Sequence, residues 1–567
     1  MRRILIGLAL AWAGGYAGVS GAGDVARPEG AKLWVPLQVA ERAAIERADE
    51  PVTGGVPLPE GLIEDASKLA LLGSDGQPVP AQFTVANRWH PGQSVKWVLL
   101  DFQASVASNG TATYHLTDAA STPAPKNPVV AKMEHETATI TTGKLKLTIK
   151  RKGFNLFDEV WVDESGAGKY DASTRIVKAD SSGISLFSAF SGLPNYKSFS
   201  PANDPDVTLD LEESGPMRAV VRLSGKHISA DPMAGGSNLL DFVCRIHTFA
   251  DSSLVKVVYT MSCRQGASIG DGVPLDRAWL SVPLSLDMSN RTWAVGLPNG
   301  QAIQPGSDVQ KVLPPWRADV EGIPGKEVDK YWKAGLEDCW ILADRSDRIQ
   351  YHGDYFRKHE PLVARGKRDK AGCQTAGWLD LADDQKGVAV GIKWFWQTWP
   401  RAVKADPSAV LVMLHANFES RPPLMSTSIG PRAYWYPGKS QTSTSMFYFH
   451  GKRDARRIAS VYAGINKPLF PAAPPAWYCE ETQAFGRLAS SGQELYDEET
   501  AKIVQNYDAR LRQTLDHILK FRDFDFGHYD HYGMFNFGDV IDFIKAQRSD
   551  PGDKNVSWDN GYYDFPH

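Results

Sequence analysis

Side chains that can transfer protons and stack on sugars are concentrated in the last 47 residues of the chain. Residues 521–567 contain twelve aromatic residues and nine aspartates but no glutamate. The densest strings run from Phe526 to Asp539 and from Trp558 to His567. Packing so many phenol, imidazole and carboxyl groups together is costly unless each polar head finds a partner. We interpret the strings as a candidate site, and the alternative is an aromatic loop core with capping aspartates.

The residue types in these strings suit β-elimination from a uronate polymer. That cleavage needs a base for the proton next to the carboxylate, a donor that stabilises the developing charge, and an acid for the departing oxygen. The phenol and imidazole candidates for base and acid are Tyr529, His531, Tyr532, Tyr563 and His567, and the amides that could donate to the carboxylate are Asn536 and Asn560. Hydrolysis by a pair of carboxylates stays open, because the aspartates could supply that pair.

Two histidines at the ends of predicted strands could add to this site. His415 ends the strand 410–415, and His450 ends the strand 444–450. Loops nearby carry Arg421, Arg432 and Arg453. We predict that His450 and Arg421 contact the substrate. The competing interpretation is a hydrogen-bonded histidine at a sheet edge.

Composition and net charge limit the classes of molecule that the protein is expected to bind. The net charge of −4 has no long run of one sign, which argues against nucleic acid as a partner and leaves saccharides open. The 17 Trp and 19 Tyr suit carbohydrate recognition, although a single Trp more often fills a core. Trp394 and Trp396 alternate along one run, so we expect both in the core between sheets rather than on a sugar-binding surface.

The sequence predicts no metal or organic cofactor. The five cysteines are scattered without the spacing of a zinc site. Cys244 and Cys263 flank a predicted hairpin and could pair, but free buried thiols are the favoured interpretation. The turn Asp523–Asp525 could bind calcium, although it lacks the spacing of a known calcium loop.

The amino terminus is typical of a secretory signal peptide. Arg2 and Arg3 precede an apolar run, 4–12, and small residues follow up to Ala22. The run is short and is interrupted by glycines, so a membrane anchor is the weaker interpretation. We expect residues 1–22 to be removed and the mature protein to be secreted or periplasmic.

Hydrophobic periodicity predicts a mainly β protein with a carboxy-terminal helical part. Period-two alternation over 31–118 and again over 130–465 indicates a small β domain and a large antiparallel β-sandwich, separated by a proline-rich linker. A second proline-rich linker, 468–475, precedes a third domain that covers 470–567. Within it, apolar residues spaced three and four apart predict a helix over 494–521, and Asp539 is a suitable N-cap for a second helix.

Short motifs along nearly the whole mature chain resemble the exo-rhamnogalacturonan lyase-like family. They include Trp34–Leu37 with Gly55–Gly61, Ser94–Phe102, Gly215–Val221, Phe447–His450 and the two terminal strings. The resemblance implies a small β-barrel, a central β-sandwich and a carboxy-terminal α/α toroid. The implied activity is exo-acting release of unsaturated galacturonosyl-rhamnose units from a pectin backbone.

The resemblance also implies site residues in the terminal strings. Asn536, Asp539, Asn560, Tyr563, Asp564 and His567 fall on toroid motifs of the family, and Asp539 and Asp564 are therefore predicted to bind substrate together with the two asparagines. A complete toroid needs more helices than this chain holds, so we expect an incomplete toroid or a fragment. A glycoside hydrolase and a non-catalytic glycan-binding protein are the alternative functions.

Overall fold

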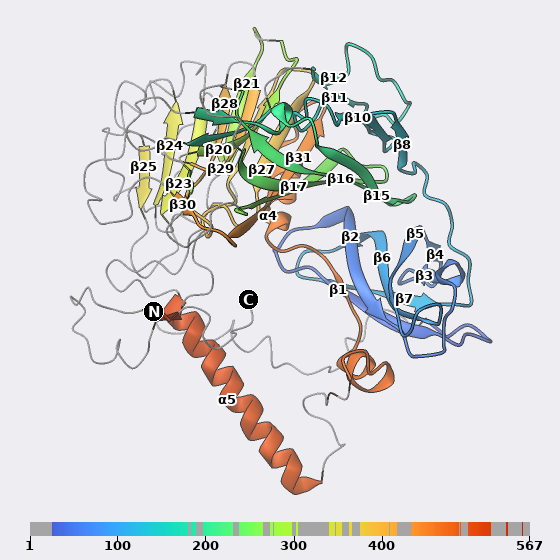
Figure 1. The fold of residues 1–567 in the computed structure, drawn as a ribbon. Coiled ribbons are helices and arrows are strands. Elements are labelled where there is room, and N and C mark those ends of the chain that lie inside the picture. Colours follow the sequence, from blue (N-terminus) through green and yellow to red (C-terminus); the bar gives the residue numbers. More distant parts are fainter. Residues whose placement is uncertain are drawn as a thin grey trace. The chain divides into compact units, whose positions relative to one another are not determined.

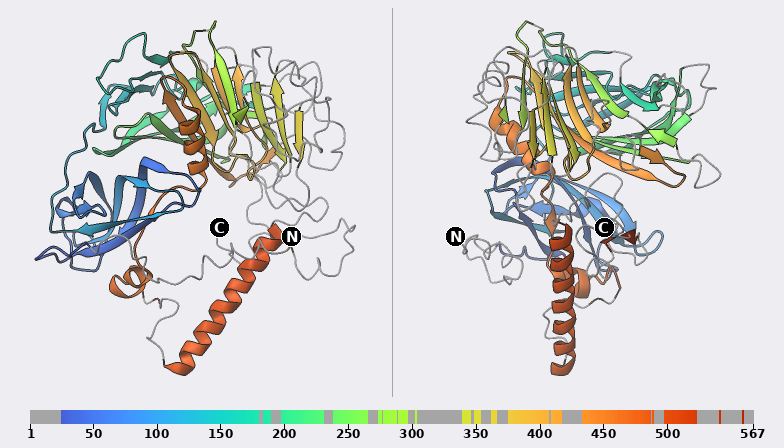
Figure 2. Two further views of the ribbon diagram at one scale, coloured as in Figure 1. Left: turned by 180° about the vertical axis from the view of Figure 1, so that it is seen from behind. Right: turned by 90° about the vertical axis from the view of Figure 1, so that its left-hand side faces the viewer.

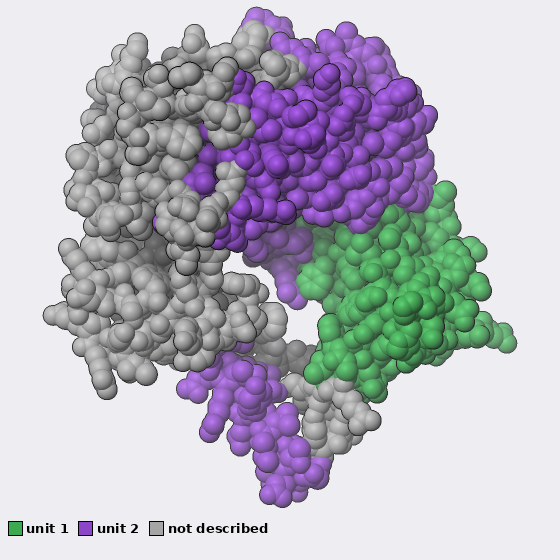
Figure 3. Space-filling model, in the orientation of Figure 1, with its two compact units in different colours: residues 1–41, 46–124, 469–490 green, residues 42–45, 125–468, 491–567 purple. Residues whose placement is uncertain are grey.

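The computed structural model describes residues 25–179, 183–188, 197–230, 238–264, 273–275, 277–287, 289–296, 302–303, 339–345, 348–353, 362–365, 375–406, 409–416, 433–486, 488, 497–522, 540–541 and 558–559. The chain divides into two compact units, which are coloured separately in Figure 3. The first unit comprises residues 1–41, 46–124 and 469–490, and the second comprises 42–45, 125–468 and 491–567.

Two antiparallel sheets surround the core of the first unit. Along β1, Val35, Leu37 and Val39 are buried and alternate with more exposed residues, as expected for a strand with one face in a core. One sheet has the order β32 (Pro471–Ala472), β1 (Trp34–Ala40), β7 (Thr111–Thr117), β3 (Ala70–Leu72) and β4 (Pro78–Val79), and the other has the order β2 (Arg47–Pro57), β6 (Val95–Val106) and β5 (Ala81–Arg88). A short 3-10 helix spans Ala66–Lys68.

Residues 469–490 complete the first unit, although the sequence assigned them to the linker and the start of a third domain. Leu469, Ala473 and Trp477 join its hydrophobic core, and Trp477 Nε1 donates a hydrogen bond of 2.8 Å to Pro57 O. Strand β32 pairs with β1, and a π-helical turn covers Trp477–Glu481. Pro471 is therefore the first residue of an integral strand of the unit, and Pro474 and Pro475 follow that strand.

The second unit is built around a large antiparallel sandwich, whose strands lie in layers in Figures 1 and 2. Its nine-stranded sheet has the order β15 (Thr208–Ser214), β16 (Arg218–Ile228), β17 (Asn238–Phe249), β18 (Leu254–Ser262), β31 (Ser440–His450), β27 (Gly387–Ile392), β26 (Trp378–Ala382), β21 (Thr292–Gly296) and β22 (Ala302–Ile303). Its eight-stranded sheet has the order β14 (Lys197–Phe199), β13 (Ile184–Ser188), β20 (Arg277–Pro283), β29 (Ala409–His415), β28 (Arg401–Asp406), β23 (Cys339–Arg345), β24 (Arg348–Gly353) and β25 (Leu362–Arg365).

Smaller elements extend the sandwich. A five-stranded sheet has the order β12 (Arg175–Val177), β11 (Glu159–Val162), β10 (Leu145–Lys150), β9 (Thr137–Thr141) and β8 (Val130–Glu134), and β19 (Val273–Leu275) pairs with β30 (Ala433–Trp435). A 3-10 helix spans Pro201–Asn203, and helix α4 spans Ala455–Ile465. Asp454 caps α4 by accepting hydrogen bonds from the backbone N–H groups of Arg456 and Arg457.

One hydrophobic core joins the three larger sheets of this unit. Its members alternate along the strands, as in Val255, Val257, Tyr259 and Met261 of β18. The mainly β fold class predicted from the sequence is confirmed. Cys244 and Cys263, which could have formed a disulfide, are both buried free thiols.

The helix predicted over 494–521 is present as α5, Glu498–Arg522. Of its predicted apolar stripe, Tyr507, Leu511 and Leu515 are exposed and Val504 is partly exposed. The prediction of a helix that begins at Asp539 is wrong for the residues described there. Val540–Ile541 form strand β33, which pairs with β34, Trp558–Asp559. Among the described residues, no helix combines the length and the apolar character needed to cross a membrane.

Candidate functional site

Most of the predicted site residues lie outside the described residues. These are Tyr529, His531, Tyr532, Asn536, Asp539, Asn560, Tyr563, Asp564, His567 and Arg421. Two short strands at the borders of the terminal strings are described. In the antiparallel pair β33–β34, Val540 is opposite Asp559 and Ile541 is opposite Trp558. The backbone directly after the first string therefore pairs with the beginning of the second string.

His450, at the end of β31, is the predicted substrate contact whose surroundings are described. Its side chain is 1% exposed, and its ring passes over Gly387 of the neighbouring strand β27. A Cβ at position 387 would lie 2.8 Å from Cε1 of this ring. The missing side chain of Gly387 thus lets the imidazole reach across β27 to Asp380 on β26.

Both ring nitrogens of His450 face oxygen acceptors. Nε2 lies 2.8 Å from Oδ1 of Asp380, and Nδ1 lies 3.0 Å from the carbonyl oxygen of Gly451. A histidine that donates through both nitrogens is protonated. Burial works against this charge, but the hydrogen bond and the charge of Asp380 outweigh burial and raise the pKa of His450 above its ordinary value.

The second carboxylate oxygen of Asp380 binds another cation, the guanidinium of Arg453. The side chain of Asp380 is fully buried, and Oδ2 accepts a hydrogen bond from Nε of Arg453. The same guanidinium donates to the carbonyl oxygen of Thr292 on β21, at 2.9 Å. The cluster of His450, Asp380 and Arg453 therefore ties the end of β31 to the middle of β26 and the first residue of β21 with charge-assisted hydrogen bonds.

Tyr448 lies on the same face of β31 as His450, with the ring centroids 5.4 Å apart. Burial, followed by the nearby charge of Glu164, raises the pKa of Tyr448 to about 12. The phenol therefore stays protonated at neutral pH and is a poor base there. Because both ring nitrogens of His450 are engaged by oxygen partners, this geometry favours the hydrogen-bonded strand-end histidine that the sequence left as the competing interpretation.

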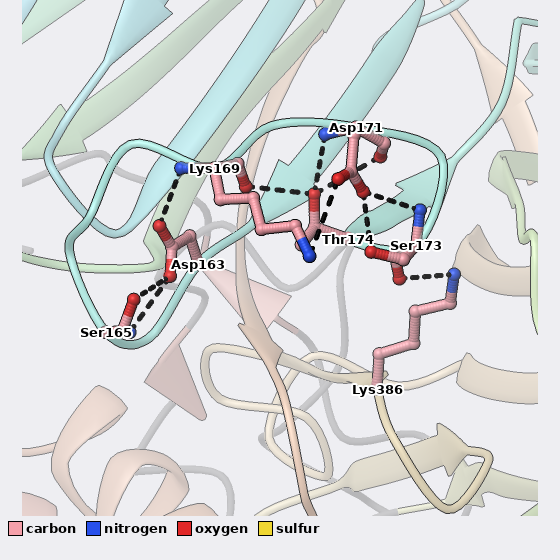
Figure 4. Close-up of polar contacts among 7 residues, drawn as sticks. All are labelled: Asp163, Ser165, Lys169, Asp171, Ser173, Thr174 and Lys386. Carbon is pink, nitrogen blue, oxygen red and sulfur yellow. Dashed lines mark hydrogen bonds and ion pairs between the residues drawn. The ribbon is translucent and has the colours of Figure 1, made fainter.

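A loop between β11 and β12 borders this cluster, and Figure 4 shows how it is held. Its Asp163 carboxylate accepts a hydrogen bond of 2.8 Å from the backbone N–H of Lys169, and that of Asp171 accepts one of 2.8 Å from the backbone N–H of Ser173. Lys386, on the turn between β26 and β27, donates to the carbonyl oxygen of Ser173 at 3.2 Å. These carboxylates are used to fold the loop, and within the described residues no group of three His, Cys, Asp or Glu side chains is placed to hold a metal ion.

The aromatic run after β27 departs from the sequence expectation. The strand ends at Ile392, and residues 393–398 form a turn, so the alternation that placed Trp394 and Trp396 on one buried face does not continue. Trp396 is buried in the core, whereas Trp394 is 49% exposed. The expectation that Trp394 fills the core is therefore wrong. The sequence signal for the turn is Gln397-Thr398 followed by Pro400, because proline disfavours continuation of a regular strand.

Residues 129–269 match the PcRGLX-like protein central beta sandwich domain family. The match covers the first part of the central sandwich, residues 129–269 of 567. The match confirms the resemblance to the rhamnogalacturonan lyase-like family that the sequence motifs indicated. The matched segment begins one residue before β8 and extends past the end of β18.

A longer curated relative is similar to part of the chain. The Uncharacterized protein YetA from Bacillus subtilis (strain 168) is 22% identical over 374 residues, which cover 62% of this chain and 40% of YetA. This chain therefore spans less than half of that curated relative.

Two solved structures illustrate the structural similarities. A protein in the Glycosyl Hydrolase Family 38 from Enterococcus faecalis is 10% identical with a TM-score of 0.45, over 79% of this chain and 48% of that chain. The galactose mutarotase related enzyme from Lactobacillus acidophilus is 9% identical with a TM-score of 0.29, over 56% of this chain and 98% of that chain.

Proposed function

We propose that this chain belongs to an exported polysaccharide lyase that cleaves rhamnogalacturonan, or a related uronate-containing polysaccharide, from a chain end by β-elimination. The observation that carries the proposal is the family match of residues 129–269. Export is supported by the basic, apolar and small-residue segments of residues 1–22. The abundance of Tyr, His, Asn and Asp side chains in the terminal strings supplies the groups that an elimination requires.

The base and the acid of this reaction are assigned to the terminal strings. Tyr529, His531, Tyr532, Tyr563 and His567 are the candidates, with Asn536, Asp539, Asn560 and Asp564 as substrate-binding residues. The pairing of β33 with β34 supports a single site, because it joins the backbone that borders the two strings. Arg421 and His450 complete the set predicted from the sequence, and His450 would then act by holding the end of β31 in place.

The test is the appearance of an unsaturated uronate when the full chain meets its polymer. Wild-type protein is incubated with rhamnogalacturonan, other pectic polymers and neutral gums, and the ultraviolet absorbance of the conjugated product is followed. We expect a rise with a uronate polymer and at least a hundredfold slower rise for His531→Ala and for Tyr563→Phe, since proton transfer by one group contributes about 10²–10⁴-fold. Tyr507→Phe, on the exposed face of α5, is the matched control.

Three results distinguish the proposal from its alternatives. New reducing ends without ultraviolet absorbance would replace the lyase with a glycoside hydrolase that uses an aspartate pair. Binding of the polymer without turnover at any pH would indicate a glycan-binding protein. A rise that is equally fast in the two site variants and in Tyr507→Phe would leave the lyase reaction standing but remove the terminal strings from it.

A further inference from the structure

Trp394 presents its indole to solvent on the surface of the sandwich unit. Its neighbour Phe395 is fully buried and Trp396 is nearly so, whereas Trp394 is 49% exposed. Leaving a large aromatic side chain in water forgoes the stabilisation that burial would bring. The turn therefore uses its other aromatic residues for packing and directs this one outward.

The backbone at Trp394 adopts a conformation that costs further free energy. Its φ angle of 54° lies in the left-handed region, which costs a residue with a Cβ about 1–2 kcal/mol. Three hydrogen bonds fix it there. Its N–H donates to Oδ1 of Asn466 at 2.6 Å, and its carbonyl oxygen accepts from the N–H and the hydroxyl of Thr398 at 3.0 and 2.8 Å.

These bonds anchor the exposed ring to two structured elements. Asn466 is the C-cap residue of α4, and Thr398 belongs to the turn that leads into β28. A glycine at position 394 would keep the turn without strain and without an exposed ring. The strain opposes folding and the exposed ring contributes little to it, and strained residues that their surroundings hold in place cluster at functional sites.

The ammonium group of Lys393 lies next to the indole of Trp394. Nζ of Lys393 lies 4.5 Å from the Trp394 ring centroid, over one face of the indole. Partial burial lowers the pKa of Lys393, and no carboxylate among the described residues offsets this effect. The adjacent pair thus combines an exposed aromatic surface with a positive charge that has no acidic partner in the described part of the chain.

We propose that Trp394 and Lys393 form a glycan-binding subsite on the sandwich, where the indole stacks on a sugar ring and the ammonium binds the carboxylate of a uronate. The proposal rests on the proposed function for the class of polymer. The sugar takes the indole face that Lys393 leaves open, and apolar C–H groups of the sugar lie against the ring. The carboxylate next to that ring is the charged group that distinguishes a uronate from a neutral sugar.

The experiment measures affinity by calorimetric titration of the full chain. The probes are an oligosaccharide of rhamnogalacturonan and the same oligosaccharide with its carboxyl groups chemically reduced. Trp394→Ala should weaken binding of both probes about tenfold, because it removes the stacking surface. Lys393→Ala should weaken binding of the acidic probe alone, by about threefold at low salt, and this difference should disappear at high salt.

A second cation–π pair in the sandwich provides the matched control. Nζ of Lys146 on β10 lies 4.9 Å from the Trp161 ring centroid on β11, but Trp161 is only partly exposed and is paired with Lys146 across the two strands. Trp161→Ala and Lys146→Ala should leave both affinities unchanged. Trp394→Phe should retain part of the affinity, and its thermal unfolding midpoint should match the wild-type value, because the ring is not part of the core.

The outcomes separate this inference from the proposed function. Unchanged affinity in Trp394→Ala, with wild-type protein that binds or cleaves the polymer, refutes the subsite and leaves the lyase proposal intact. Equal losses in Trp394→Ala and Trp161→Ala also refute the subsite, since the effect then belongs to the sandwich as a whole. A wild-type protein that neither binds nor cleaves any of the polymers refutes both.

Discussion

The buried carboxylate of Asp380 offers a sharp test of how the end of the sandwich is held together. Asp380 accepts hydrogen bonds from two cations, Nε2 of His450 and Nε of Arg453, and its own side chain is fully buried. Asp380→Asn keeps the shape of the side chain and one acceptor but removes the negative charge. Two cations would then face a neutral amide away from water. Breaking a buried ion pair costs about 3–5 kcal/mol, so we expect the free energy of unfolding to fall by about 3 kcal/mol near pH 6.

The pH dependence of this loss follows from His450. Its pKa is raised in the folded protein above the ordinary value of 6.5. The stabilisation that its proton provides is therefore fully present below pH 6.5 and is lost as the pH rises through the raised pKa. The difference in the free energy of unfolding between wild type and Asp380→Asn should accordingly shrink from about pH 6 to pH 9. The part of this difference that comes from Arg453 should persist.

The assay is urea unfolding followed by tryptophan fluorescence at several pH values. Asp210→Asn is the control, since Asp210 forms an exposed pair with Arg222 on the same sheet, at 3.5 Å. That variant should match wild type at every pH. A loss in Asp380→Asn below about 1 kcal/mol, or one that is equal at pH 6 and pH 9, would contradict the assigned charges of the cluster.

Three further changes test other parts of the fold. Burial lowers the pKa of His227 to about 4 and that of His247 to about 2, so below pH 6.5 the unfolded chain binds protons that the native state does not bind. The free energy of unfolding should therefore fall as the pH drops below 6.5, and His227→Gln should reduce this fall in urea unfolding. Trp477→Ala should cost about 3–5 kcal/mol and lower the calorimetric transition of the first unit, because the indole fills its core; an unchanged transition would show that residues 469–490 are dispensable there. Arg401→Lys should destabilise the sandwich by about 2 kcal/mol in urea unfolding, because the single ammonium of lysine cannot replace both Nη1, which donates to the Leu414 carbonyl and the Ser443 hydroxyl, and Nε, which donates to the Thr398 carbonyl; full stability of this variant would refute that bridge.

The architecture of the strands could be predicted because it follows from local patterns. Alternation over the strand 255–261 reproduces the buried face of β18, and the three- and four-residue spacing over 494–521 reproduces α5. Such patterns report which side of an element is apolar. They fail where the chain leaves a regular element, as at Ile392, where β27 ends and the turn that exposes Trp394 begins.

The partners of the candidate site could not be predicted, because they are set by sheet order. Asp380 and His450 are separated by 70 residues in sequence, and they meet only because β27 lies between their strands and carries a glycine at the crossing point. Likewise, Trp477 reaches Pro57 across 420 residues of sequence. Periodicity contains no information on which strands become neighbours, so the sequence could place His450 at a strand end but could not identify what it binds.

The two proposals assign binding and chemistry to different parts of the chain, and the ionisation of the described groups supports this division. In the cluster at the end of β31, both ring nitrogens of His450 are engaged by oxygen partners and the phenol of Tyr448 keeps its proton, so neither group is suited to remove a proton at neutral pH. The cluster instead fixes strand ends next to the turn from β26 to β27. Trp394 and Lys393 follow directly after β27 and offer a surface for a sugar but no base. A lyase built on this sandwich must therefore take its base from residues outside this cluster and this turn, and the phenols and imidazoles of the terminal strings are the groups to which the proposal assigns that role.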